Sequence, residues 1–247
     1  MSIKTTLNYS PNFDSKKRSF NKIKFIIFHY TGMKKELDAI KKLTNIKSKV
    51  SSHYLIKNNG EIVVLVPDLY VAWHAGVSHW KNFKSLNKNS IGIEISNSGH
   101  NFKYKKFSKK QIQAILKISK FLIKNYKINK RNILGHSDIA PNRKKDPGEK
   151  FPWQYLAKFG VGHWHSLSNK ILSKNRMKKI ELIDKKNFYN NLSKIGYSIE
   201  SPKMIKQDKF LVLLIKAFQR RFRQELINGK IDKECLLISE NLVKKLT

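Results

Sequence analysis

The run KIKFIIFHY, residues 22–30, constrains the fold of this 247-residue chain more than any other segment. It combines β-branched and aromatic side chains and stops at Thr31-Gly32. This composition predicts a strand that is buried inside the protein. The other elements of the chain must therefore pack around it.

Further strands and helices are interspersed along the first part of the chain. SHYLIKNNGEIVVLVP (52–67) predicts a hairpin with an Asn-Gly turn, and SIGIEISNSG (90–99) predicts a strand with alternating isoleucines. A helix is predicted within residues 33–45, and a longer one follows Ser108, which forms a capping box with Gln111. This mixture predicts an α/β domain with a central mixed β-sheet flanked by helices.

The pattern changes after about residue 175. Apolar side chains at helical spacing predict three short helices with no strand between them, and Gly196 is expected to end the first of these helices. We therefore predict two domains, residues 1–175 and a small three-helix module at residues 176–247, with the boundary fixed only to about ten residues.

The charge of the chain is strongly basic. It carries 51 Lys+Arg against 17 Asp+Glu, a formal net charge of +34, which would suit nucleic acid. The lysines are, however, spread along the whole chain together with many Ile and Asn, as a general compositional bias would produce. No segment resembles a nucleic-acid-binding motif. We expect no nucleic-acid partner; a nucleic-acid-binding protein remains the alternative, and it predicts binding that weakens steeply with salt.

The cysteine content and the amino terminus bear on the cellular compartment. The single cysteine, Cys235, excludes an internal disulfide and a thiolate metal cluster. The first twenty residues have no apolar core of signal-peptide length, and FIIF (25–28) is too short to span a membrane. We expect a soluble cytoplasmic protein with no transmembrane segment. The alternative is the periplasm or cell envelope, if a leader has been removed.

Two histidines stand at the ends of predicted buried strands, His29 in IIFHYTG and His136 in ILGHSD. An isolated histidine in such a place is more often a hydrogen-bonded structural residue. A carboxylate, Asp146, is presented on an Asp-Pro-Gly turn nearby in the sequence. Two imidazoles and one carboxylate are the ligand set of a catalytic zinc ion that keeps an open position. The spacing forms no compact metal-binding motif, so both interpretations remain open.

A glutamate lies inside the predicted strand at 90–99. Glu94 shares one face of that strand with Gly92 and Ser96, opposite the isoleucines. This face could point to solvent. If it points to the crevice at the strand-end histidines, Glu94 could accept a proton from a water molecule. Lys144, two residues before Asp146, could stabilise a developing oxyanion.

Five segments occur in an order that we recognise in a protein family. They are FIIFHYTG, SSHYLIKNNGEIVVLVPD, AWHAGVSHW, NSIGIEISNSG and GHSDIAPNRKKDPGEKFPW. Together they resemble the zinc N-acetylmuramoyl-L-alanine amidases of the amidase-2 superfamily, which includes the peptidoglycan recognition proteins. The resemblance is closest to the AmpD/AmiD type and covers about residues 5–160. The tail, LSKIGY to INGKID, resembles the three-helix peptidoglycan-binding module often attached to such enzymes.

The resemblance implies an activity and a set of site residues. It implies one zinc ion held by His29, His136 and Asp146, a catalytic glutamate at Glu94 and an oxyanion-stabilising lysine at Lys144. The implied reaction is hydrolysis of the amide bond between N-acetylmuramic acid and L-alanine. The implied partners are peptidoglycan or (anhydro-)muropeptide fragments, and the sequence does not decide between these substrates.

The resemblance also places a substrate groove at Trp73, His74 and Ala75. We interpret Asp138, in the loop between His136 and Asp146, as a carboxylate that organises the loop by bonding nearby backbone amides. A peptidoglycan sensor of the same fold that binds without cleaving is the alternative function. The sequence predicts no particular oligomeric state.

Overall fold

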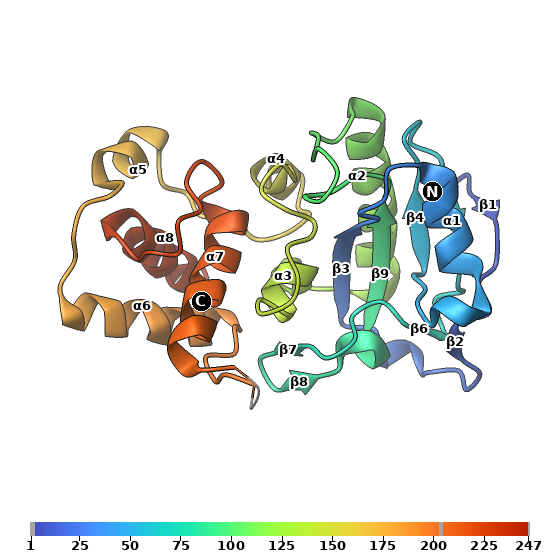
Figure 1. Ribbon diagram of the computed structural model, residues 1–247, viewed down its shortest axis with the longest axis horizontal. Coiled ribbons are helices and arrows are strands. Elements are labelled where there is room, and N and C mark those ends of the chain that lie inside the picture. Colours follow the sequence, from blue (N-terminus) through green and yellow to red (C-terminus); the bar gives the residue numbers. More distant parts are fainter. Residues whose placement is uncertain (1–2, 203–204, 247) are drawn as a thin grey trace.

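A six-stranded mixed sheet forms the centre of the computed structural model, which describes residues 3–202 and 205–246 (Figure 1). The strand order is β1 (Thr6–Leu7), β5 (Ile62–Val64), β4 (Tyr54–Ile56), β9 (Ser90–Ile95), β3 (Phe25–Tyr30) and β10 (Ile133–Gly135). Strands β4, β9, β3 and β10 are parallel, β5 is antiparallel to β4, and β1 is parallel to β5. The predicted strands and the hairpin are confirmed. Residues 1–2, 203–204 and 247, which the two predicted domains include, lie outside the description.

Short elements connect the main strands. Two small two-stranded sheets pair β2 (Phe13–Asp14) with β6 (Val71–Ala72) and β7 (His79–Trp80) with β8 (Phe83–Lys84). Single turns of 3₁₀ helix lie at Phe20–Lys22, Ile46–Ser48, Leu86–Asn89 and Lys130–Asn132. The sequence patterns gave no sign of these elements, because each is too short to show periodicity.

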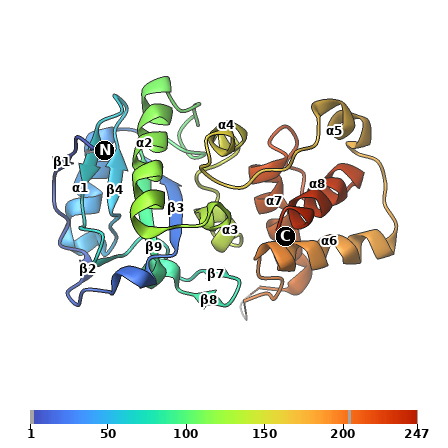
Figure 2. The ribbon, with the colours of Figure 1, turned by 180° about the vertical axis from the view of Figure 1, so that it is seen from behind.

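Helices cover both faces of the sheet. The long helix α2 (Lys109–Tyr126) lies in front of the sheet in Figure 2, and its Ile115, Ile118 and Leu122 join a buried cluster with Ile26 and other strand residues. Its predicted capping box is present: Ser108 Oγ accepts from the Gln111 amide, and the Gln111 side chain accepts from the Ser108 amide. In the described ranges, no helix is both long enough and apolar enough to cross a lipid bilayer.

The opposite face carries α1 (Glu36–Thr44), whose Leu43 packs with Leu55 of β4. Leu37, Ile40 and Leu43 lie about one helical turn apart in the sequence, which predicts one apolar face, but Leu37 is 68% exposed. The contact is made by Leu43 and by Ile40, which is partly buried against the same cluster, so the buried face of α1 is narrower than its sequence suggests.

The segment that follows β10 is a short helix where the sequence suggested a loop. Helix α3 (His136–Ile139) begins directly at His136, and α4 (Trp153–Lys158) follows after the Asp146 turn. Both helices lie on the side of the sheet that faces the carboxy-terminal part of the chain (Figure 1).

Four helices make up the carboxy-terminal part. They are α5 (Asn169–Asn175), α6 (Leu182–Ile195), α7 (Gln207–Phe222) and α8 (Lys233–Lys244). Helices α6 and α8 pack against each other, and α5 packs against α8. Gly196 ends α6 with a φ of 133°, as predicted. Figures 1 and 2 show these helices as one group beside the sheet, with α3 and α4 between.

One apolar core extends through both parts of the chain. Phe25 and Ile27 of β3 and Leu134 of β10 belong to the same buried cluster as Phe188 of α6 and Phe218 of α7. The cluster is bridged by Trp80, whose ring lies 4.7 Å from that of Tyr197. The division at residue 175 stays a prediction, and the core is continuous across it.

Phe218→Ala tests this shared core, because Phe218 is fully buried in it. We expect the free energy of unfolding to fall by about 3–5 kcal/mol. All four tryptophans lie before residue 175, and the rings of Trp80 and Trp164 contact aromatic rings of the carboxy-terminal part, so their fluorescence reports on the sheet and on this contact. The denaturant transitions seen by tryptophan fluorescence and by far-ultraviolet circular dichroism should move together.

Phe20→Ala, at a phenylalanine that is 53% exposed, is the control and should shift both transitions much less. A fluorescence transition that stayed at the wild-type midpoint in Phe218→Ala would show that the two parts unfold independently.

Candidate active site

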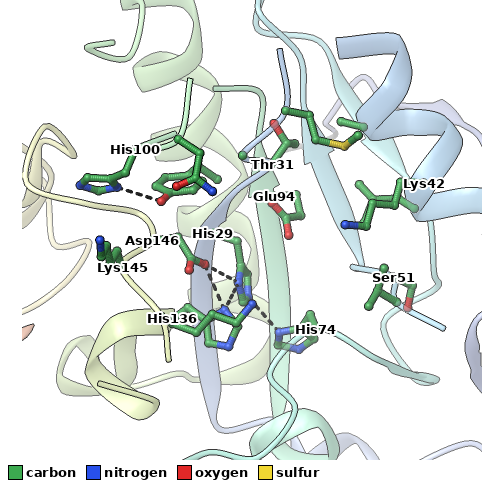
Figure 3. Close-up of a pocket in the computed structure, with 18 of the residues that line it drawn as sticks. His29, Thr31, Lys42, Ser51, His74, Glu94, His100, His136, Lys145 and Asp146 are labelled. Atoms are coloured by element: carbon green, nitrogen blue, oxygen red, sulfur yellow. Dashed lines mark hydrogen bonds and ion pairs between the residues drawn. The ribbon is translucent and has the colours of Figure 1, made fainter. Parts of the chain in front are cut away.

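Three potential metal ligands meet at the carboxyl end of the central strands. His29 lies near the end of β3, and His136 directly follows β10, which pairs in parallel with β3. The Nδ1 atoms of the two histidines lie 2.9 Å apart, and each lies 3.0 Å from Oδ2 of Asp146 (Figure 3). All three residues are buried. Two imidazole nitrogens and one carboxylate oxygen that face a common point form a suitable set of metal ligands.

The protonation of these groups favours metal binding. Burial, and then the neighbouring His136, lower the pKa of His29 to about 4, so its imidazole is neutral near pH 7. Burial alone would raise the pKa of Asp146, but the two histidines hold it well below its usual range. Neutral imidazole and ionised carboxylate are the forms that bind a metal ion.

A chain of hydrogen bonds fixes the tautomer of His29. The Ser90 hydroxyl donates to the Leu86 carbonyl over 2.7 Å, so it can accept from Nε2 of His74 at 3.1 Å. This leaves Nδ1 of His74 as an acceptor, and Nε2 of His29 donates to it over 3.0 Å. Nδ1 of His29 is therefore the unprotonated nitrogen that faces the cluster.

A backbone carbonyl fixes the tautomer of His136. Its Nε2 lies 3.1 Å from the Ala75 carbonyl, which can only accept, so Nε2 carries the proton and Nδ1 is free. Arg143 also donates to the Ala75 carbonyl and, over 2.6 Å, to the Val77 carbonyl. The backbone at residues 75–77 is thus held in place on the side of His136 away from the ligand atoms.

The polar face of β9 points into the site. Glu94 is in register with His29 on β3 and with Leu55 on β4. On the same face, a Cβ added at Gly92 would lie 2.4 Å from Cγ of His74, so the imidazole of His74 lies directly over this glycine. The sequence left open whether this face of β9 points to solvent or to the crevice, and in the structure it points to the site.

The carboxylate of Glu94 is available to a ligand. Its Oε2 is buried and, among the residues that the structure describes, no group donates a hydrogen bond to it. Burial, followed by the charge of Asp146, raises the pKa of Glu94 to about 8. A buried carboxyl without a partner is costly, and such groups are typical of functional sites.

A pocket of about 460 Å³ opens over these residues, within the range of small-molecule sites. It is lined by His29, His136, Asp146, Glu94 and Lys144, and its rim includes further polar and basic side chains. In the view of Figure 3, Lys42 and Ser51 lie on one side of Glu94, and His100 and Lys145 lie on the other.

Comparison with known proteins identifies the family. Residues 19–149 match the family described as N-acetylmuramoyl-L-alanine amidase (Amidase_2). The chain belongs to this amidase family. The N-acetylmuramoyl-L-alanine amidase AmiD of Escherichia coli (strain K12) is 37% identical over 240 residues, which cover 92% of this chain and 84% of AmiD. The 1,6-anhydro-N-acetylmuramyl-L-alanine amidase AmpD of the same strain is 41% identical over 105 residues, 42% of this chain and 55% of AmpD.

Solved structures resemble this amidase over nearly its whole length. The complex of Escherichia coli AmiD with anhydro-N-acetylmuramic acid-L-Ala-D-gamma-Glu-L-Lys superposes with a TM-score of 0.77 at 35% identity and covers 94% of this chain and 93% of AmiD. AmpDh3 from Pseudomonas aeruginosa gives a TM-score of 0.78 at 29% identity, with 99% and 98% coverage. The predicted family, fold and enzyme class are confirmed, whereas the resemblance of the tail to a peptidoglycan-binding module remains a prediction.

The amidase brings most of the predicted site residues together. The pocket is lined by His29, His136, Asp146, Glu94, Lys144, Trp73 and His74. Ala75 is fully buried and lies outside the pocket, where its carbonyl accepts from His136. His74 lies both at the pocket and against His29, and Nε1 of Trp73 donates to Asp14 over 2.7 Å.

The sequence did not predict a second hydrogen-bonded chain on the pocket wall. The Tyr30 hydroxyl lies 2.8 Å from Nδ1 of His100, and Nε2 of His100 lies 2.9 Å from Oε2 of Glu149. Tyr30 and His100 both line the pocket. These three residues come from segments about fifty to seventy positions apart and share no motif, so only the fold reveals that they are neighbours.

Gly92→Ala tests the close approach of His74 to β9. Glycine inside a strand ordinarily makes a protein less stable than alanine does, so the same change would increase stability at a position with free space for the Cβ. Here the added Cβ overlaps the His74 imidazole, and we expect the free energy of unfolding to fall by about 1–3 kcal/mol. The measurement is denaturant unfolding of the single variants and of Gly92→Ala combined with His74→Ala.

In the His74→Ala background the overlap is absent, and Gly92→Ala should cost almost nothing. An equal loss in both backgrounds would show that the penalty does not come from His74.

Proposed function

We propose that this amidase hydrolyses the amide bond between the lactyl group of N-acetylmuramic acid and L-alanine, with a zinc ion held by His29, His136 and Asp146. The observation that carries the proposal is the convergence of three ligand atoms with both imidazole tautomers fixed by partners behind them. Such outer partners orient metal ligands and increase their basicity.

The ligand set suits zinc in particular. Two neutral imidazoles and one carboxylate supply three ligands and leave a fourth position for water or substrate. When bound, zinc supplies a Lewis acid that polarises a carbonyl and makes water more acidic. The described pocket opens directly over the three ligand atoms, so a substrate carbonyl can reach them.

Glu94 carries the proton in the proposed mechanism. Its carboxylate takes one proton from the attacking water as the new C–O bond forms. The same carboxyl then gives that proton to the L-alanine nitrogen as the C–N bond breaks, which yields a free acid and a free amine. A raised pKa brings the two protonation states of Glu94 closer in free energy near neutral pH, as this exchange requires.

Lys144 supports the negative charge that develops on the carbonyl oxygen. It lies in the loop between the ligands His136 and Asp146, where its amide donates to the Ala140 carbonyl over 3.0 Å, and it lines the pocket. A fixed cation at a developing oxyanion stabilises the transition state more than the ground state. We assign Trp73 and His74 to the substrate side of the pocket and Ala75 to the positioning of His136.

We further propose muropeptides as substrates. AmiD was solved with an anhydro-N-acetylmuramic acid tripeptide, and AmpDh3 with an anhydromuramic pentapeptide. The open pocket of the amidase suits such soluble fragments, and stem peptides of intact peptidoglycan present the same bond.

Glu94→Gln tests the proton-transfer role. The substitution keeps the shape of the side chain and removes the base, so we expect kcat to fall by about 10²–10⁴ on a soluble anhydro-muropeptide. Its zinc content should equal that of the wild type, because Glu94 is not a ligand. Product is measured by chromatography of released peptide, with metal-stripped and zinc-restored wild type in parallel.

Metal-stripped protein should be inactive and should recover with zinc. Equal release by wild type, Glu94→Gln and metal-stripped protein would refute the zinc mechanism. A wild type that retained muropeptide without releasing peptide would indicate a sensor.

Lys144→Ala tests the oxyanion role, and Lys145→Ala is the matched control in the adjacent position. Loss of one oxyanion stabiliser typically lowers kcat by about 10²–10³, and we expect a loss of that size for Lys144→Ala. Lys145 is exposed at the rim of the pocket, so its removal should change KM by a few fold at most. Equal losses in kcat from the two substitutions would contradict a specific role for Lys144.

A further inference from the structure

Asp138 lies in the same short helix as the metal ligand His136. This helix, α3, is a single turn, and Asp138 is fully buried within it. Its Oδ2 accepts from the Gly135 amide over 2.8 Å, which confirms that it organises the loop. The position of this carboxylate therefore sets the position of the turn that presents His136.

The other partners of Asp138 come from the carboxy-terminal part of the chain. The Tyr197 hydroxyl, just after α6, donates to Oδ1 over 2.7 Å, and Arg221 Nη1 of α7 donates to Oδ2 over 2.6 Å. Both side chains are buried, and no other ion pair among the described residues joins the two parts. Figures 1 and 2 both show α3 between the sheet and α7.

Arg221 holds the strand as well as the turn. Its Nη2 donates to the Ile133 carbonyl of β10 over 3.0 Å, while its guanidinium lies over the Trp153 ring at 4.3 Å. The guanidinium of Arg221 thus links β10, the strand before His136, to α3, the turn that begins at His136. Lysine could not make both contacts with this geometry.

The turn is also bonded to the third ligand. The Ser137 amide donates to the Asp146 carbonyl over 2.8 Å, so α3 and Asp146 are held together. A displacement of α3 would therefore move His136 and Asp146 together, relative to His29 on β3. Metal sites tolerate displacements of only a fraction of an ångström.

We propose that Arg221 and Tyr197 are positioning residues of the metal centre, which hold α3 so that His136 and Asp146 stay aimed at the metal. The proposal rests on the zinc site proposed above. It makes the carboxy-terminal helices part of the catalytic machinery, whatever they bind in addition. Loss of Arg221 would leave the buried charge of Asp138 uncompensated, and loss of the Tyr197 hydroxyl would remove a hydrogen bond from the same carboxylate.

The experiment compares full-length Arg221→Gln and Tyr197→Phe with the control Arg223→Gln. Arg223 is also buried on the same segment, but it pairs with Asp232 and Glu234 inside the carboxy-terminal part. The readouts are the zinc dissociation constant, from competition with a chromophoric chelator, and kcat and KM on a soluble anhydro-muropeptide. Thermal unfolding of each protein is measured alongside.

We expect Arg221→Gln to raise the zinc dissociation constant by about 10–100-fold, the range found when outer partners of metal ligands are removed. Its kcat should fall with little change in KM, and Tyr197→Phe should show the same changes to a smaller extent. Arg223→Gln should lower the unfolding temperature and leave zinc affinity within about twofold of wild type.

Zinc affinity and kcat that fall no more in Arg221→Gln than in Arg223→Gln would overturn the positioning role. If Arg221→Gln fails to fold, Tyr197→Phe decides: wild-type zinc affinity in that variant overturns the proposal, and a raised dissociation constant supports it. A wild-type protein that bound no zinc would refute the proposed function itself, before any substitution is compared, and the positioning role with it.

Discussion

The parallel pairing of β3 with its two neighbours is the constraint on which the site depends. On one side it puts β9 in register, so that Glu94 stands beside His29. On the other side it aligns β10, which delivers His136 to the same edge of the sheet. Because side chains alternate along a strand, a shift of one residue in β9 would turn Glu94 towards α2 and an isoleucine towards the ligands. The apolar contacts of Ile91, Ile93 and Ile95 with α2 therefore also fix the catalytic geometry.

Both histidine ligands are held by hydrogen-bonding partners on the side away from the metal-binding atoms. His29 is backed by His74 and Ser90, and His136 by the carbonyl of Ala75. Because Gly92 has no side chain, the imidazole of His74 can pack directly against β9. His74 and Ala75 lie just after β6 and Ser90 begins β9, so the segment between these two strands places the groups that support both imidazoles.

The sequence predicted the central strands, the long helix and the ligand set, because these rest on local periodicity and on motifs in family order. It did not predict the contacts of α3 with α7 or the hydrogen bonds that link Tyr30, His100 and Glu149, since these join segments far apart.

The use of arginine in the sequence is a signal that could have indicated some of the buried contacts. The chain contains only seven arginines among its 51 basic residues, and Arg18, Arg220, Arg221 and Arg223 are all buried. In a chain that uses lysine almost everywhere, Arg18, Arg221 and Arg223 mark positions where a buried guanidinium donates to more than one partner.

The continuous core also has a consequence for how the protein is made. Synthesis begins at the amino terminus, so β3, β10 and the ligand loop leave the ribosome before α6 and α7 exist. Until then Phe25, Ile27 and Leu134 have no cover from Phe188 and Phe218. The nascent amidase thus presents an apolar surface that is covered only when the last quarter of the chain has been made.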